Sequence, residues 1–254
     1  MARKEIKKEE KPRETLVEFL ASSATVLVTA LFVITFVFQN FEIPTSSMEN
    51  TLLIGDHVFV NRVQFAPGTG WLGPLLPYPA IKRGDIVVFL HPRDPGLYVV
   101  KRIIGIPGDR IHLRDGMVYR NGEKLDEPYT IPHNPDTFYE YRDNFPSAPP
   151  EANAQYPDGE MSLRSHIEDD DIVVPPGTYF GMGDHRDVSL DSRYWGFIPR
   201  ENIVGRPLFI YWSFETPRGQ WQKTGMMDRL SFVGQVMIHF FDETRWSRMF
   251  KVVR

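Results

Sequence analysis

The chain has 254 residues, of which 24% are charged, and a formal net charge of −4 at pH 7. This length and composition are typical of a folded protein with a sizeable core. The weakly acidic balance disfavours nucleic acid as a partner, because neutralising phosphates requires clustered lysine and arginine. The chain contains no cysteine, which excludes disulfides, thiolate metal sites and cysteine nucleophiles. Any nucleophile must therefore be an oxygen or an amine.

The first element in chain order is an apolar segment, 19–38, which carries no charged residue. At about twenty residues, it is long enough to cross a bilayer as a helix. Lysine and arginine outnumber glutamate in the preceding segment, 1–18, so the positive-inside rule keeps that segment cytoplasmic and sends the rest of the chain outward. A cleavable signal peptide is the alternative, but the apolar stretch is too long and no small-x-small cleavage site follows it. The sequence therefore predicts a single-pass anchor in a lipid bilayer.

The next region, 39–225, predicts a mainly β body. Its β-branched or alternating runs are typical of strands: 58–63, 85–90, 97–106 and 203–214. Within 110–125, the pair Asn121-Gly122 suits the type I′ turn of a hairpin. Prolines interrupt the region of about 126–171, which we expect to be an irregular excursion from the core, either a small subdomain or a flap.

Two further segments place apolar residues where they could contact a membrane. Trp71 and Leu72 lie in a loop rich in glycine and proline, which either folds back on the core or dips into the bilayer interface. The tail, 226–254, is typical of an amphipathic helix that either packs on the β body or lies on an anionic membrane, since its uncharged run is too short to span one. The tail residues that would favour such a membrane surface are Arg245, Arg248, Lys251, Arg254, Trp246 and Phe250.

The residues that could carry chemistry are a serine in the turn 43–52 and a lysine in a strand. A serine hydroxyl is a weak nucleophile until a base takes its proton, and the chain has no G-x-S-x-G elbow of an α/β-hydrolase. Lys101 lies within the β-branched run YVVKRII. If its stem covers the sheet edge, it stays an ordinary charged lysine. If it points into the core, desolvation lowers its pKa from about 10.4 towards about 8, and the neutral amine can deprotonate Ser47.

Five segments of the chain resemble, in order, the conserved boxes of type I signal peptidases: PTSSMENTL, GDHVFV, KRGDIVVF, YVVKRIIGIPGD and GDHRDVSLDSRYWGFI. The resemblance covers most of the chain after residue 38. It implies a β-rich body of two subdomains behind one transmembrane helix, in the bacterial inner (plasma) membrane. It also implies a serine endopeptidase that removes signal peptides from exported preproteins, cutting after small-x-small sites such as Ala-x-Ala. We expect a monomer that needs no cofactor and no metal, since no metal-binding or nucleotide-binding motif is visible.

Matching the boxes residue by residue implies a role for each site residue. Ser47, the serine directly before the methionine, is the nucleophile, and Lys101 is the general base. The hydroxyl of Thr45 and the backbone N–H of Ser47 form the oxyanion hole. Ser189 orients the amine of the lysine. Two residues of the DSR triplet resemble a structural ion pair: Asp191 and Arg193.

The pockets for the small substrate residues are also implied by the resemblance. The side chains that we expect to line them or to contact the substrate are Phe41, Ile43, Pro44, Met48, Leu52, Val99 and Val100. We expect the substrate to bind as an extended strand beside the segments that precede Ser47 and Lys101.

Two positions depart from the family pattern. Asn50 stands where the family commonly has proline, which we expect to alter the stiffness of the loop without removing the dyad. His185 stands where the family has asparagine. A triad of Asp184, His185 and a serine is disfavoured, because adjacent residues of an extended chain point in opposite directions.

Two other functions remain open at this point. One is a specialised Ser-Lys processing peptidase with a narrow substrate; a self-cleaving repressor is disfavoured by the membrane anchor and by the lack of a DNA-binding helix pair. The other is an inactive, membrane-tethered β-rich domain that only binds peptides. The joint presence of Ser47, Lys101, Thr45 and Ser189 argues against this second alternative.

Overall fold

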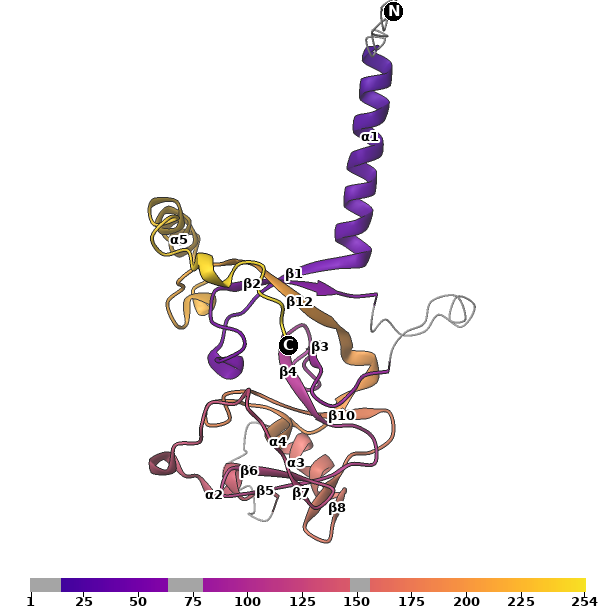
Figure 1. The fold of residues 1–254 in the computed structure, drawn as a ribbon, viewed down its shortest axis with the longest axis vertical. Helices are drawn as coiled ribbons and strands as arrows, with labels where there is room; N and C mark the ends of the chain where they lie inside the picture. Colours follow the sequence, from indigo (N-terminus) through magenta and orange to yellow (C-terminus); the bar gives the residue numbers. More distant parts are fainter. Residues whose placement is uncertain (1–14, 64–79, 147–155) are drawn as a thin grey trace, which may run out of the picture.

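The computed structural model describes residues 15–63, 80–146 and 156–254. One long helix rises from one end of a body made of two β-sheets (Figure 1). The prediction of a mainly β protein behind one N-terminal apolar helix is thereby confirmed. The loop that contains Trp71 and Leu72 lies outside the described residues.

The N-terminal helix runs directly into the body. Helix α1 (Leu16–Phe32) starts at a capping box, in which the Thr15 hydroxyl accepts the N–H of Glu18 and the Glu18 carboxylate accepts the N–H of Thr15. A π-helical turn, Val33–Val37, follows it. The stretch Leu16–Thr35 has a mean hydropathy of 2.1 and is long enough to cross a membrane. The helix begins before residue 19, and strand pairing replaces it at residue 38, the last residue of the predicted segment.

The larger sheet has seven strands, all paired antiparallel. In spatial order these are β1 (Phe38–Glu42), β2 (Asp56–Asn61), β12 (Ile203–Ser213), β3 (Ile86–Leu90), β4 (Tyr98–Gly105), β10 (Thr178–Met182) and β11 (Ile198–Pro199). Because side chains alternate between the faces of a strand, the β-branched runs of β3 and β4 supply two cores. Val100 packs with Ile43 and Met48 on one face, and Val99 packs with Tyr156 and Trp195 on the other.

The smaller sheet has five strands, in the order β7 (Glu123–Lys124), β6 (Met117–Arg120), β5 (Arg110–Arg114), β9 (Asp171–Val173) and β8 (Ile167–Glu168). The predicted hairpin turn joins β6 to β7, with φ of +54° at Asn121 and +81° at Gly122, as a type I′ turn requires. A second tight turn at Asp115 and Gly116, also with positive φ, joins β5 to β6 and was not predicted.

The described parts of the proline-rich region at about 126–171 are residues 126–146 and 156–171. They contain short helices beside irregular stretches, and they pack in one core with strands of the smaller sheet. The region ends in β8 and in the first residue of β9, and β9 pairs with β5. The remaining helices of the described chain are α2 (Glu140–Asp143), α3 (Pro157–Arg164), α4 (Ser192–Trp195) and α5 (Met226–Ile238), with short 3-10 turns at Ser46–Met48, Pro135–Thr137, Arg200–Asn202, Gln220–Gln222 and Trp246–Arg248.

The tail divides into an exposed helix and a strap. Side chains of α5 are largely exposed, and no residue of this helix is buried. Residues 239–254 then return to the sheet, where Val252 bridges to Phe209 and Thr244 bridges to Phe214. Val253 is buried in the same core as Met48. The alternative of packing on the body therefore holds for the strap, whereas the membrane alternative stays a prediction for the exposed α5.

Two arginines of the strap bind the body and not a lipid surface. Arg245 donates to the carbonyl oxygens of Ile54 and Phe214. Arg248 donates to the carboxylate of Asp56 through Nε at 3.0 Å and through its Nη2. The idea that these two side chains face lipid headgroups is therefore wrong, because both are needed for buried polar groups next to the serine loop.

Replacing Arg248 by methionine tests the strap. The Asp56 carboxylate is fully buried and would keep only the hydroxyl of Ser213 and the N–H of Leu53 as partners. Removing one partner of a buried ion pair costs about 3 kcal/mol. We expect Arg248→Met to lower the free energy of unfolding by that amount, measured by urea denaturation in detergent. The exposed Lys251→Met is the matched control, and an equal loss in both variants would contradict a specific role for Arg248.

Candidate active site

The loop between β1 and β2 holds Ser47 by burying its neighbours. Ile43 and Met48, on either side of the serine, are 3% and 1% exposed. The turn after Met48 closes through Asn50, which has φ of +91° and donates its side-chain amide to the carbonyl of Tyr129 at 2.8 Å. Proline fixes φ near −65°, so it could not adopt this conformation, whereas asparagine tolerates it. The departure from the family pattern at Asn50 thus accompanies a backbone conformation that proline cannot adopt.

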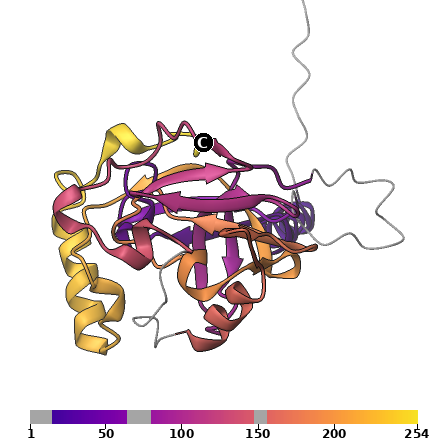
Figure 2. The ribbon, with the colours of Figure 1, turned by 90° about the horizontal axis from the view of Figure 1, so that it is seen from below.

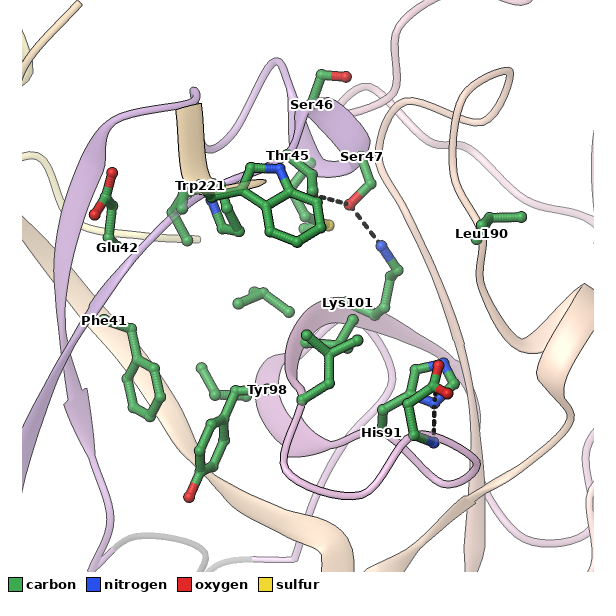
Figure 3. Close-up of a pocket in the computed structure, with 18 of the residues that line it drawn as sticks. Phe41, Glu42, Thr45, Ser46, Ser47, His91, Tyr98, Lys101, Leu190 and Trp221 are labelled. Atoms are coloured by element: carbon green, nitrogen blue, oxygen red, sulfur yellow. Dashed lines mark hydrogen bonds and ion pairs between the residues drawn. The ribbon is translucent and has the colours of Figure 1, made fainter. Parts of the chain in front are cut away.

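Ser47 and Lys101 meet in the structure. The side chain of Lys101 comes from β4, is 2% exposed, and donates from Nζ to Ser47 Oγ over 2.6 Å (Figure 3). The hydroxyl of Thr45 lies 3.5 Å from Ser47 Oγ on the other side. The arrangement therefore places a base within hydrogen-bond reach of a nucleophile, as general-base catalysis requires.

Burial makes the Lys101 amine a usable base. Desolvation lowers its pKa from the ordinary value to about 8, and the carboxylates of Asp191 and Asp184 oppose this shift while the guanidinium of Arg193 adds to it. A shift of this size costs about 3 kcal/mol of folding free energy at neutral pH. The side chain thus points into the core, as one of the two sequence alternatives required.

Asp191 and Arg193 form an ion pair behind the dyad, and both side chains are 0% exposed. Arg193 donates to the carboxylate twice, from Nε and from Nη2, each at 2.8 Å. Burial alone would raise the pKa of Asp191, but Arg193 outweighs it and holds that pKa below the usual range. Asp191 also accepts the N–H of Gly183, so the pair fixes the segment beside Ser47.

Ser189 lies beside the dyad but is not bonded to the lysine in this structure. Its hydroxyl is buried and has no hydrogen-bond partner among the described residues. A Cβ added to Gly183 would lie 2.4 Å from both Ser189 Oγ and the carbonyl oxygen of Ser47, so the three segments meet only because residue 183 is glycine. The predicted contact of Ser189 with the amine therefore stays a prediction.

Asp184 and His185 serve other partners than the Ser47 hydroxyl. The backbone N–H of His185 donates to the carbonyl of Ser47 at 3.1 Å, while its imidazole lies 3.4 Å from a carboxylate oxygen of Glu49. Asp184 is fully buried and accepts two hydrogen bonds from Arg102, at 2.8 and 2.7 Å. Arg102 follows Lys101 on β4 and points to the opposite face. We did not single out Arg102 from the sequence, although its place beside the lysine was a signal.

The dyad opens into a cavity of about 400 Å³. Of the predicted pocket residues, the structure brings six to its wall: Phe41, Ile43, Pro44, Met48, Val99 and Val100. Leu52 is the exception, because it is fully buried in the core with Met48 and does not line the cavity.

Several lining residues were missed by the sequence analysis: Glu42, Val88, His91, Asp94, Leu97, Tyr98, Tyr156, Val188, Leu190 and Trp221. Tyr98 and Leu97 could have been found, since Tyr98 precedes Val99 on β4 and Leu97 lies directly before that strand. Trp221 is 53% exposed and comes from a distant 3-10 turn, and it lines the same cavity as Thr45 and Ser47 (Figure 3). Leu190 lies on the side of the dyad away from Phe41 (Figure 3). Neither Trp221 nor Leu190 carried a local sequence signal.

One group of ligand-type side chains lies outside this cavity. The ligand atoms of His133, Asp143 and Asp187 lie within 4.8 Å of one another. Arg142 supplies a positive charge there, since its guanidinium donates twice to Asp143, at 2.7 and 2.8 Å, and lies 3.6 Å from Asp187. The group is therefore an ion-pair network that ties the 126–146 segment to the loop after β10.

The chain is similar to known signal peptidases over most of its length. The model of the family described as "Signal peptidase, peptidase S26" matches residues 16–212. Signal peptidase I of Pseudomonas fluorescens is 33% identical over 222 residues, which cover 80% of this chain and 75% of that protein. Signal peptidase I of Aquifex aeolicus is 32% identical over 231 residues, covering 76% and 82%. The crystal structure of a signal peptidase I from Enterococcus faecalis, 27% identical, covers 50% of this chain and 97% of that one with a TM-score of 0.32.

The buried amine makes stability depend on pH in a defined window. Above about pH 8 the native amine is neutral, whereas an unfolded lysine keeps its proton up to about pH 10.5. The native state binds fewer protons in that window, so the free energy of unfolding should rise with pH from about 8 to 10.5. We expect Lys101→Met to have a free energy of unfolding about 3 kcal/mol higher than that of the parent at pH 7, measured by urea denaturation. The variant should also lose the rise in this free energy between about pH 8 and 10.5. A Lys101→Met variant less stable than the parent at pH 7 would contradict the desolvation cost.

Proposed function

Because this chain belongs to the signal peptidase family, peptidase S26, we propose that Ser47 and Lys101 form the catalytic dyad with which it removes signal peptides. As a member of that family it is a serine endopeptidase. The observation that carries the proposal is the 2.6 Å bond between a hydroxyl and an amine that is 2% exposed and has a pKa of about 8. A surface lysine would stay protonated at neutral pH and could not act as a base.

The geometry supports a simple sequence of steps. The neutral amine of Lys101 takes the proton of Ser47 while Oγ attacks the substrate carbonyl carbon. The hydroxyl of Thr45 and the N–H of Ser47 would donate to the oxygen that becomes negative, which contributes several kcal/mol in such sites. The ammonium of Lys101 then protonates the departing amine of the mature protein, and water, deprotonated in turn by Lys101, releases the signal peptide from Ser47.

The substrate would bind along an open strand edge. Strand β10 pairs with β4 only from Arg102 to Gly105, so residues 98–101 of β4 have no strand partner on that side within the described chain. An extended peptide can pair with such an edge. Ile43, Met48 and Val100 then leave shallow apolar space beside the dyad, which suits alanine at the first and third positions before the cut.

The two other functions weighed above are less well supported. An inactive peptide-binding domain has no need of a buried amine, which costs folding free energy, held against a serine. A narrow processing peptidase would share the same dyad, so the substrate tests distinguish it from the general enzyme. The family match and the relatives named signal peptidase I favour the general one.

Helix α5 supports a membrane position for one end of the body. It lies at the same end of the body as the base of α1 (Figure 1). Figure 1 shows α5 end-on, whereas Figure 2, turned by 90°, shows it along its length. The helix therefore runs across the direction of α1, parallel to a bilayer that α1 would cross. Its exposed apolar side chains are Met226, Met227, Leu230, Val233, Met237 and Ile238, followed by Phe241. We propose that α5 lies in the interface of the outer face of the membrane, with residues 1–18 cytoplasmic.

The choice of nucleophile can be tested with two neighbouring serines. Ser46 and Ser47 share one 3-10 turn, but only Ser47 is bonded to Lys101. We expect Ser47→Ala to reduce cleavage of an Ala-x-Ala preprotein by at least about 10³-fold, and Ser46→Ala to retain most of it. The measurement is the rate of appearance of mature protein in detergent. Loss in Ser46→Ala with retention in Ser47→Ala would overturn the assignment.

The membrane position can be tested with cysteine labels, because the native chain has no cysteine. We expect a polarity-sensitive fluorophore on Ile238→Cys to be quenched by a lipid-phase quencher when the full chain is in vesicles, since this side chain is 78% exposed on α5. The control is Met161→Cys, 72% exposed on α3 at the far end of the body, which should stay in water and react with an impermeant maleimide outside intact spheroplasts. Equal quenching at both sites, or protection of Met161→Cys from the outside reagent, would contradict the proposed placement.

A further inference from the structure

The side chains that line the cavity fall into two groups, one on each face of β4, and we call each group a lobe. The first lobe contains Phe41, Ile43, Met48 and Val100, whose side chains belong to one core. The second lobe contains His91, Asp94, Leu97, Val99 and Tyr156. Val99 and Tyr156 belong to the opposite core, and His91 packs against the ring of Tyr156 at 5.3 Å. The alternation of side chains along β4 therefore divides the lining of the cavity into these two groups.

A peptide on this edge must place successive side chains in different lobes. In paired strands, side chains directly opposite each other lie on the same face of the sheet. Successive side chains along one strand alternate between the two faces. If the first and third residues before the cut enter the lobe of Ile43 and Val100, the residue between them faces the lobe of Leu97 and Val99. This holds whatever the exact register of the peptide. The middle residue of small-x-small therefore meets a defined surface.

The second lobe presents an apolar wall that ends in a negative charge. Leu97 and Val99 supply the wall, and the half-exposed Asp94 carboxylate accepts the hydroxyl of Tyr156 at 2.8 Å. Arg93, the adjacent cation, is turned away and donates to the carbonyl oxygens of Trp195 and Asp158, at 3.4 and 3.2 Å. The net charge offered to a ligand in this lobe is therefore negative.

His91 does not neutralise that charge. Its Nδ1 accepts the backbone N–H groups of Arg93 and Asp94, at 3.1 and 3.0 Å, which requires this nitrogen to be unprotonated. Burial also lowers the pKa of His91, against the opposing effect of Asp94. The side chain of Lys101 also lies on this face, at the dyad, and its amine is mainly neutral above about pH 8.

We propose that the second lobe selects a basic residue, lysine or arginine, between the two small residues of the cleavage site. The aliphatic stem of such a side chain would lie on Leu97 and Val99, and its cationic head would reach Asp94 beside the ring of Tyr156. Asp94 is then a residue that determines specificity, while Ser47 and Lys101 keep their proposed roles as nucleophile and base. The inference rests on the proposed function, because it assumes that the peptide is cut at Ser47.

The test compares matched peptides, Ala-Lys-Ala, Ala-Glu-Ala and Ala-Met-Ala, with the full-length protein in detergent at pH 9. A half-exposed carboxylate should favour lysine over glutamate by about five-fold in kcat/KM. We expect Asp94→Asn to bring this ratio near one and Asp94→Lys to invert it, with methionine between the two charged residues in the parent. Asp158→Asn is the matched control, since Asp158 is exposed and offers Arg93 only its carbonyl, and it should leave the ratio unchanged.

Each result bears on one proposal only. A ratio that survives Asp94→Asn, or that changes instead in Glu42→Gln on the other side of the cavity, overturns the role of Asp94 and leaves the dyad intact. No cleavage of any peptide that depends on Ser47 would instead contradict the proposed function itself.

Discussion

The amine of Lys101 is buried against the hydroxyl of Ser47, and much of the structure serves to keep it there. A charged lysine in this position is unfavourable by about 3 kcal/mol at neutral pH, so the surrounding body must hold it rigidly or it would turn to solvent. The larger sheet does so by pairing Lys101 of β4 with Val87 of β3, with Gly181 of β10 close to its Cβ. The same burial that costs stability also supplies the neutral base.

Buried ion pairs surround the amine without pairing with it. Asp191 is fully bonded to Arg193, and Asp184 is fully bonded to Arg102, so neither carboxylate makes a hydrogen bond with the lysine. If either carboxylate bonded to Nζ, the ammonium would be stabilised and the pKa would return towards its ordinary value. Each arginine therefore holds a carboxylate near the site but binds it, so that the carboxylate does not bond to the amine. This arrangement explains why a network that looks structural also governs the basicity of Lys101.

Local patterns predicted most of this fold and the two ends of the dyad. The β-branched runs around Lys101 and the Asn121-Gly122 turn follow short-range rules, and the order of the boxes carried the proposed roles of Ser47 and Thr45. What could not be predicted depends on long-range packing. The return of Arg248 to Asp56 joins residues 192 apart in the chain, and Trp221 reaches the cavity from another turn. Leu52 is apolar and near Ser47, but periodicity alone does not show whether such a residue faces the cavity or the core.

The continuity of α1 with β1 links the candidate membrane span to the cavity. The π-helical turn Val33–Val37 leads into β1 without an intervening loop, and Phe41 of β1 lines the cavity. On the proposed membrane placement, so short a connection keeps the body near the bilayer, because each extended residue adds only about 3.3 Å. Under the proposed function, a signal peptide whose own apolar segment is in the membrane would pair with the open edge of β4 in an extended form. The proposed preference for small side chains near the cut then has a geometric reason, since a bulky residue facing Ile43 and Val100 would push the peptide off the edge and away from Ser47.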